Sequence, residues 1–144
     1  MQNILVQTTK FPHVPEGDLE RNNGSPGSAF AIWLSQKLSA MGLSCDEVCQ
    51  EDYGWGFWIK SKEHTIWICV SYAADEDEDG KAISKPDSEP ADWFVSVNFE
   101  DPMLLLKPWQ WGRFKTGGEE QRRIASLLLD ALQAEPEITV VRIE

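Results

Sequence analysis

One acidic segment has residue types that are typical of a metal-binding loop, and its sequence is Asp75-Glu76-Asp77-Glu78-Asp79-Gly80. Alternating carboxylates with a glycine at the sixth position open the loop that wraps a calcium ion in oxygen ligands. Counted from Asp75, however, the twelfth position holds Pro86, where such a loop needs a bidentate glutamate. The flanking residues also lack a helical pattern. We therefore interpret the segment as a solvated acidic loop and predict neither a metal ion nor a cofactor.

A wider acidic stretch surrounds this loop. Residues 74–101 contain ten carboxylates and two lysines, within a chain of 144 residues whose formal net charge is -11. A segregated negative surface attracts basic proteins and repels nucleic acid, whereas dispersed acidic charge serves only solubility. Both interpretations stay open at this point. The predicted partner-binding residues are Asp75, Glu76, Asp77, Glu78, Asp79, Asp87, Glu89, Trp109 and Trp111.

The seven tryptophans give a second line of inference. Trp109 and Trp111 lie in a proline-containing segment beside Lys107, where they could be binding hot spots or could pack over a sheet. Trp58 projects from its expected strand on the side opposite Trp55. An alternative function is therefore a small-molecule or saccharide-binding or hydrolytic cleft. Its wall would include Trp58, Trp109 and Trp111, and the carboxylates at its mouth would be Glu51, Asp52 or Asp92.

The sequence predicts no catalytic residue. His13 stands between prolines and His64 in a hairpin turn, and neither has the spacing of a catalytic or metal-ligating pair. The three cysteines are Cys45, Cys49 and Cys69, an odd number with no Cys-x-x-Cys motif, so we expect reduced thiols that serve packing. An enzyme is accordingly less expected than a binding protein.

Apolar periodicity predicts the elements that must position these residues. A three- and four-residue period predicts helices over 28–41, capped by Ser28, and over 119–134, after a break at Gly117-Gly118. Alternation predicts strands over 4–10, 55–60, 65–72, 92–100 and 138–143, and a further strand-like run that begins at Cys45, whereas 102–114 shows no clean period. We expect one α+β domain over 1–144, in which two helices pack on one face of a mostly antiparallel five- or six-stranded sheet. The acidic loop spans about 74–91.

The chain contains the segment Glu51-Asp52-Tyr53-Gly54-Trp55-Gly56-Phe57-Trp58-Ile59, with Trp93, Pro102 and Trp109 downstream. In these residues it resembles small acidic bacterial proteins that share an acidic-aromatic-Gly-Trp hairpin and have no assigned function. The resemblance implies a bacterial cytoplasmic single domain and transfers no site residue. The sequence has no apolar run of membrane-spanning length, so we expect no membrane partner. The favoured function is a non-catalytic protein-binding domain, for example an immunity or inhibitor protein that covers a basic partner.

Overall fold

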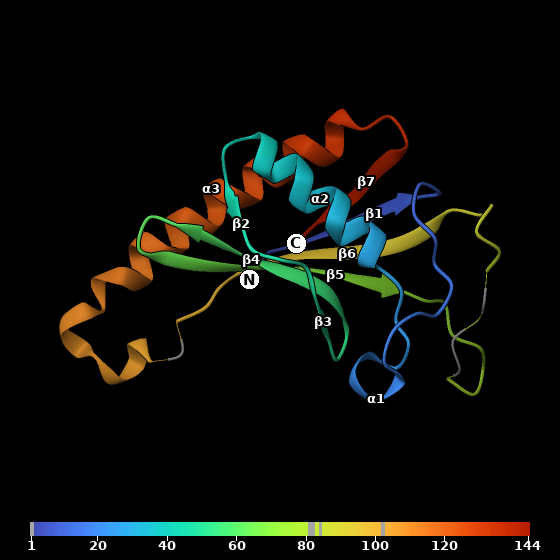
Figure 1. The fold of residues 1–144 in the computed structure, drawn as a ribbon, viewed down its shortest axis with the longest axis horizontal. Helices are drawn as coiled ribbons and strands as arrows, with labels where there is room; N and C mark the ends of the chain where they lie inside the picture. Colours follow the sequence, from blue (N-terminus) through green and yellow to red (C-terminus); the bar gives the residue numbers. More distant parts are fainter. Residues whose placement is uncertain (1, 81–82, 84, 102) are drawn as a thin grey trace.

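A computed structural model describes residues 2–80, 83, 85–101 and 103–144, and it has an α+β fold (Figure 1). Over these residues the sheet contains seven strands, which are β1 (Gln2–Thr8), β2 (Ser44–Cys45), β3 (Cys49–Glu51), β4 (Gly54–Ser61), β5 (His64–Ala73), β6 (Ala91–Phe99) and β7 (Ile138–Ile143). The helical elements are α1 (Leu19–Asn22), α2 (Ser28–Ala40), α3 (Gly112–Ala134) and the 3-10 turns η1 (Leu104–Leu106) and η2 (Pro108–Gln110).

The strands lie in the order β2-β4-β5-β6-β1-β7, and β3 pairs with β4 beyond the end of β2. Every pair of neighbouring strands is antiparallel. The predicted α+β class is confirmed. The number of strands exceeds the expected five or six because the run expected from Cys45 forms two short strands, β2 and β3, beside β4.

The main hydrophobic core lies between α2, α3 and one face of the sheet. Phe57, Ile68 and Val95 project from β4, β5 and β6 toward the helices and are fully buried. Phe30 of α2 and Leu128 of α3 are buried in the same cluster. The two helices therefore share one face of the sheet, as their apolar stripes predicted.

The start of α2 differs from the prediction. The residue preceding the helix is Gly27, with φ 139°, and no side chain of the helix caps it, so Ser28 is not the cap. The carboxylate of Glu16 instead accepts hydrogen bonds from the backbone N–H groups of Gly27 and Ser28, at 3.0 and 2.8 Å. An anionic acceptor at a helix N-terminus is favourable, and it ties the loop before α1 to the helix.

The start of α3 also differs from the prediction. The helix begins at Gly112 and continues through Gly117 and Gly118, where the sequence predicted a break. The two 3-10 turns immediately precede it, within the segment predicted to be irregular. Among the helices that the structure describes, none combines the length and apolar character needed to cross a bilayer.

Candidate functional site

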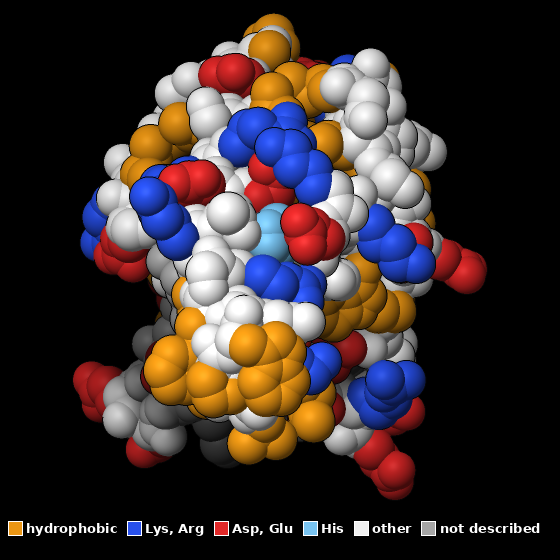
Figure 2. Space-filling model, turned by 90° about the vertical axis from the view of Figure 1, so that its left-hand side faces the viewer, with side chains coloured by type: hydrophobic (Ala, Val, Ile, Leu, Met, Phe, Trp, Pro, Cys, Tyr) orange, Lys and Arg blue, Asp and Glu red, His pale blue; other side chains and the backbone are white. Residues whose placement is uncertain are grey.

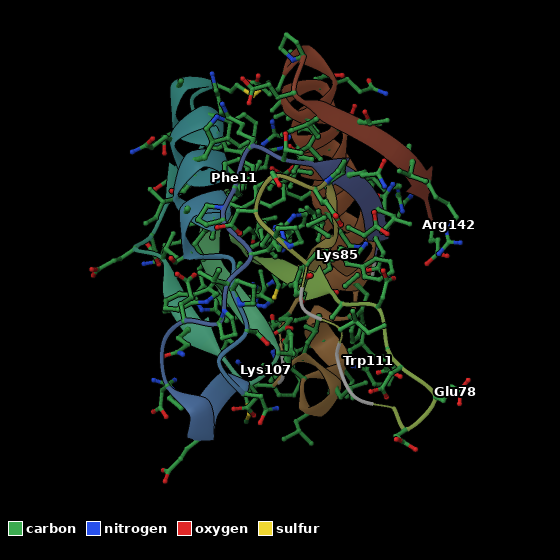
Figure 3. The ribbon with its side chains drawn as sticks, turned by 90° about the vertical axis from the view of Figure 1, so that its right-hand side faces the viewer. Phe11, Glu78, Lys85, Lys107, Trp111 and Arg142 are labelled. Carbon is green, nitrogen blue, oxygen red and sulfur yellow. The ribbon has the colours of Figure 1, made fainter. Side chains whose placement is uncertain are left out.

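The acidic loop joins β5 to β6 at one end of the molecule, on the right in Figure 1. Glu78 lies at its protruding tip, pointing away from the body of the protein (Figure 3). The seven predicted carboxylates of this loop are all exposed, and we call them the acidic end: Asp75, Glu76, Asp77, Glu78, Asp79, Asp87 and Glu89. Within the described ranges, no group of three His, Cys, Asp or Glu side chains is placed to hold a metal ion.

A cleft of about 300 Å³ opens beside the acidic end. The residues that line it are His13, Pro15, Asn23, Gly24, Ser25, Pro26, Tyr72, Ala74 and Ile83. They come from the loops that flank α1, from the end of β5 and from the acidic loop. The cleft therefore joins two parts of the sequence that are about sixty residues apart, and the pattern of either part alone gives no sign of it.

His13 is the most informative residue of this cleft, because only 1% of its side chain is exposed. Its Nε2 lies 3.0 Å from the carbonyl oxygen of Lys85, and its backbone N–H donates to Asp87 Oδ1 at 3.0 Å. A carbonyl oxygen only accepts, so Nε2 carries the hydrogen. Nδ1 lies 3.6 Å from Asp87 Oδ1 and has no hydrogen-bond partner in the part of the chain that the structure describes.

The cleft wall is a stack of aromatic rings that continues into the core. The rings of His13 and Tyr72 are stacked with centroids 5.7 Å apart and planes 13° apart, and Tyr72 packs on Trp93 at 5.3 Å. Trp93 in turn meets Phe30 of α2 edge to face. Burial raises the pKa of the Tyr72 hydroxyl, an effect that the nearby Lys85 opposes. The cleft wall is therefore continuous with the hydrophobic core.

Trp109 and Trp111 do not lie beside the acidic end. They belong to η2 and to the residue after it, at the opposite end of the long axis, on the left in Figure 1. Trp109 is 77% and Trp111 50% exposed, so neither packs over the sheet. The structure therefore divides the predicted partner-binding residues between two separate surfaces.

The residues of the alternative cleft are not brought together either. Trp58 and Asp92 both project from the sheet face away from the helices, and Trp58 packs on Trp67 at 4.9 Å. Trp67 pairs with Asn98 of β6, and Asp92 is six residues from Asn98 along that strand, about 20 Å at the usual rise. Glu51 ends β3 and Asp52 lies in the turn after it. These positions do not form a pair of carboxylates flanking one substrate bond.

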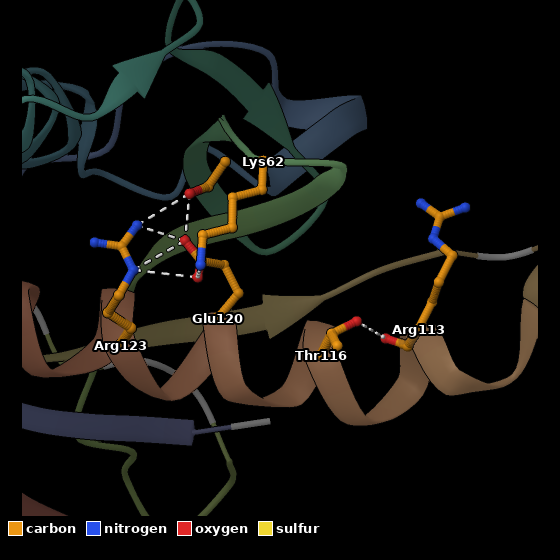
Figure 4. A network of polar contacts seen from close by, with 6 residues as sticks. Lys62, Arg113, Thr116, Glu120 and Arg123 are labelled. Carbon is orange, nitrogen blue, oxygen red and sulfur yellow. Dashed lines mark hydrogen bonds and ion pairs between the residues drawn. The ribbon is translucent and has the colours of Figure 1, made fainter.

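A buried polar cluster that the sequence analysis missed lies between the β4–β5 hairpin and α3 (Figure 4). Glu120 is 3% exposed and accepts hydrogen bonds from Ser61 and Arg123, while Lys62 Nζ lies 3.8 Å away. The Arg123 hydrogen bonds, supported by Ser61 and Lys62, lower the pKa of Glu120 to about 2. Both carboxylate oxygens are thus occupied by the protein's own groups.

This cluster lines a cleft of about 270 Å³ together with His64, Glu63, Thr116 and Glu119. Its acids and bases nearly balance, and Glu120, its most buried acid, is fully engaged. We therefore assign it a structural role, that of fastening the hairpin to α3. The spacing of Glu120 and Arg123, three residues apart within a predicted helix, was the available sequence signal.

No protein-family model matches this sequence, and no match was found among curated proteins or solved structures.

Proposed function

We propose that this protein is a non-catalytic protein-binding domain whose acidic end docks a basic protein partner, as an immunity or inhibitor protein would. The observation that carries the proposal is the buried, unpartnered Nδ1 of His13 in a cleft beside exposed carboxylates. Charge alone would serve solubility equally well. The cleft at the same end adds a place where a partner side chain can be anchored.

The chemistry of the cleft favours an arginine or lysine side chain as the anchor. The carboxylate of Asp87 lies 3.6 Å from Nδ1 of His13 and is half exposed, so a guanidinium or ammonium donor can reach it from solvent. Tyr72 lines the same cleft, with His13 stacked on its ring and Trp93 packed against it. The acidic loop would attract the partner over longer range, and the cleft would then hold one of its basic side chains.

The two roles can be separated kinetically after capture of a partner on the immobilised full-length protein. Asp75→Asn/Asp77→Asn/Asp79→Asn should slow association several-fold at low salt and leave dissociation nearly unchanged. A matched variant removes the same charge elsewhere, at the exposed Glu47, Glu119 and Asp130, and should change association little. His13→Phe keeps an aromatic ring but removes both ring nitrogens, including the Nε2–H group that donates to the carbonyl of Lys85, and should speed dissociation about tenfold.

The proposal fails if no basic protein is retained at low salt. It also fails if the two triple variants slow association equally, because net charge rather than the acidic end would then be responsible. Equal dissociation rates for the His13→Phe variant and the unmodified protein would remove the cleft from the interface and leave only the charged loop.

A further inference from the structure

The end of the molecule opposite the acidic end carries an exposed apolar patch that the proposed function does not use. We call it the apolar tip, and its residues are Met103, Leu105, Leu106, Trp109, Trp111 and Phe114. The exposed fractions of Leu105, Leu106 and Trp109 are 71%, 69% and 77%. Within residues 103–114, only Leu104 is fully buried, and its side chain anchors the turns η1 and η2 to the rest of the protein. Figure 2 shows hydrophobic side chains gathered in the lower part of this end, with Lys and Arg side chains beside and above them.

The backbone of the apolar tip is largely satisfied by its own turns. The N–H groups of Leu106, Lys107 and Gln110 donate to carbonyl oxygens three residues earlier, at 3.1, 3.0 and 2.9 Å. The indole N–H of Trp111 donates to the carbonyl of Leu104 at 3.1 Å. Such a segment can leave water for a medium of low dielectric constant without losing these hydrogen bonds.

The charge of this segment is opposite to that of the rest of the protein. Residues 103–118 contain Lys107, Arg113 and Lys115 and no acidic residue, within a chain of net charge -11. Arg113 is held by Asp101 at 3.4 Å and donates to the carbonyl of Glu63 at 2.7 Å. Lys107 and Lys115 form no ion pair with another described residue, so their charges face solvent beside the apolar tip.

The charge and exposure of the apolar tip indicate which kind of partner it binds. A second copy that docked through the same patch would bring Lys107 and Lys115, unpaired among the described residues, close to their own copies, which is unfavourable. The most exposed side chains of the tip, Leu105, Leu106 and Trp109, project from two tight turns, which suits insertion into a fluid surface. Leu105 and Phe114 also line a cleft of about 380 Å³, whose other lining residues are Phe99, Glu100 and Asp101. Tryptophan and leucine beside lysine are the residues that enter the interface of a negatively charged bilayer.

We propose that the apolar tip binds the surface of an anionic lipid bilayer. Trp109, Leu105 and Leu106 enter the interfacial region, and Lys107 and Lys115 contact acidic headgroups. This orientation places the acidic end at the far side of the molecule, where like-charge repulsion from the lipid is weakest (Figure 1). The contact is peripheral, and it is independent of the proposed function at the other end.

Flotation of the full-length protein with vesicles tests this proposal. Vesicles of phosphatidylcholine and phosphatidylglycerol in equal parts should bind at least about tenfold more tightly than phosphatidylcholine alone, and added salt should weaken the difference. Leu105→Glu/Leu106→Glu should abolish binding to both. Lys107→Gln/Lys115→Gln should reduce binding to the mixed vesicles alone.

The matched control is Ile32→Glu/Val141→Glu, which places two charges on exposed apolar positions outside the tip and should bind as the unmodified protein does. Circular dichroism and melting temperature establish that each variant is folded. The proposal is overturned if the unmodified protein does not float with mixed vesicles at low salt, or if the tip and control variants float equally. Self-association that the tip variant abolishes, without vesicle binding, would assign the tip to a second copy instead.

Discussion

Gly117 lies inside α3 directly against the ring of Phe99, the last residue of β6. A Cβ atom on Gly117 would overlap the Phe99 ring carbons, whereas one on Gly118 would meet only Arg122 Nη1, at 3.7 Å. The helix therefore crosses the sheet closely at this point because residue 117 has no side chain. The two neighbouring glycines have different roles, although they are identical in the sequence.

Gly117→Ala should destabilise the protein by about 1–3 kcal/mol, because Phe99 or the helix must shift to admit the methyl group. Gly118→Ala is the control, and it should be neutral or stabilising by up to about 1 kcal/mol, because alanine favours a helix interior. Urea unfolding of both variants measures the difference. Equal effects would show that the Phe99 contact does not restrict residue 117.

The same contact explains why the predicted helix began too late. A Gly-Gly pair is a reasonable break signal when only local propensity is considered, since glycine costs a helix about 1 kcal/mol per residue. The packing of α3 on β6 outweighs that cost, and such packing is invisible along the sequence. The stripe of Ile124 and Leu128 was predictable because it is contained within three turns of one helix.

The candidate surfaces show the same difference between what a local sequence pattern predicts and what depends on contacts between distant segments. The exposure of the acidic loop followed from its composition, because seven close carboxylates cannot be buried without partners. The separation of Trp109 and Trp111 from that loop could not be predicted, since it depends on the direction in which β6 runs. The engagement of Glu120 by Ser61 also depends on a contact across 59 residues. Sequence patterns therefore indicated what each segment carries, but not which segments meet.

Leu128→Ala should lower the free energy of unfolding by about 2–5 kcal/mol, because Leu128 is fully buried between α3 and the sheet. Leu127→Ala is the matched change on the adjacent, half-buried position and should cost less. Chemical denaturation measures the free energy of unfolding of both variants, and the two values are compared where the dependence on denaturant concentration, the m-value, is unchanged. A loss below about 0.5 kcal/mol for Leu128→Ala would contradict its place in the core.

The three cysteines should react with a thiol reagent in a fixed order. All are free, but Cys49 is exposed, Cys45 is half-buried and Cys69 is fully buried. The expectation that all three thiols serve packing is therefore wrong for Cys49. Burial raises the pKa of Cys69 to about 11, so it holds almost no thiolate at pH 8. Labelling followed by peptide mapping should modify Cys49 first and Cys69 only on unfolding. Labelling of Cys69 as fast as Cys49 would contradict its burial.

The Glu120 cluster should make stability depend on pH in the acidic range. The folded protein lowers the pKa of this carboxyl from 4.5 to about 2, chiefly through the Arg123 hydrogen bonds. Since the carboxylate is favoured by folding, its stabilisation is fully present above pH 4.5 and is lost as the pH falls toward 2. The shift corresponds to about 3 kcal/mol at neutral pH, and it applies to a side chain that is only 4% exposed.

Glu120→Gln should therefore reduce the free energy of unfolding at pH 7 by about 3 kcal/mol, and the difference from the unmodified protein should shrink steadily below pH 4.5. Glu119→Gln is the control, because Glu119 is exposed on the next position of the same helix and should change stability little at any pH. Urea titrations at pH 7, 5, 4 and 3 measure both variants. A Glu120→Gln deficit that stayed constant across this range would mean that the glutamine loses packing or hydrogen-bond geometry, and that the charge on Glu120 does not stabilise the fold.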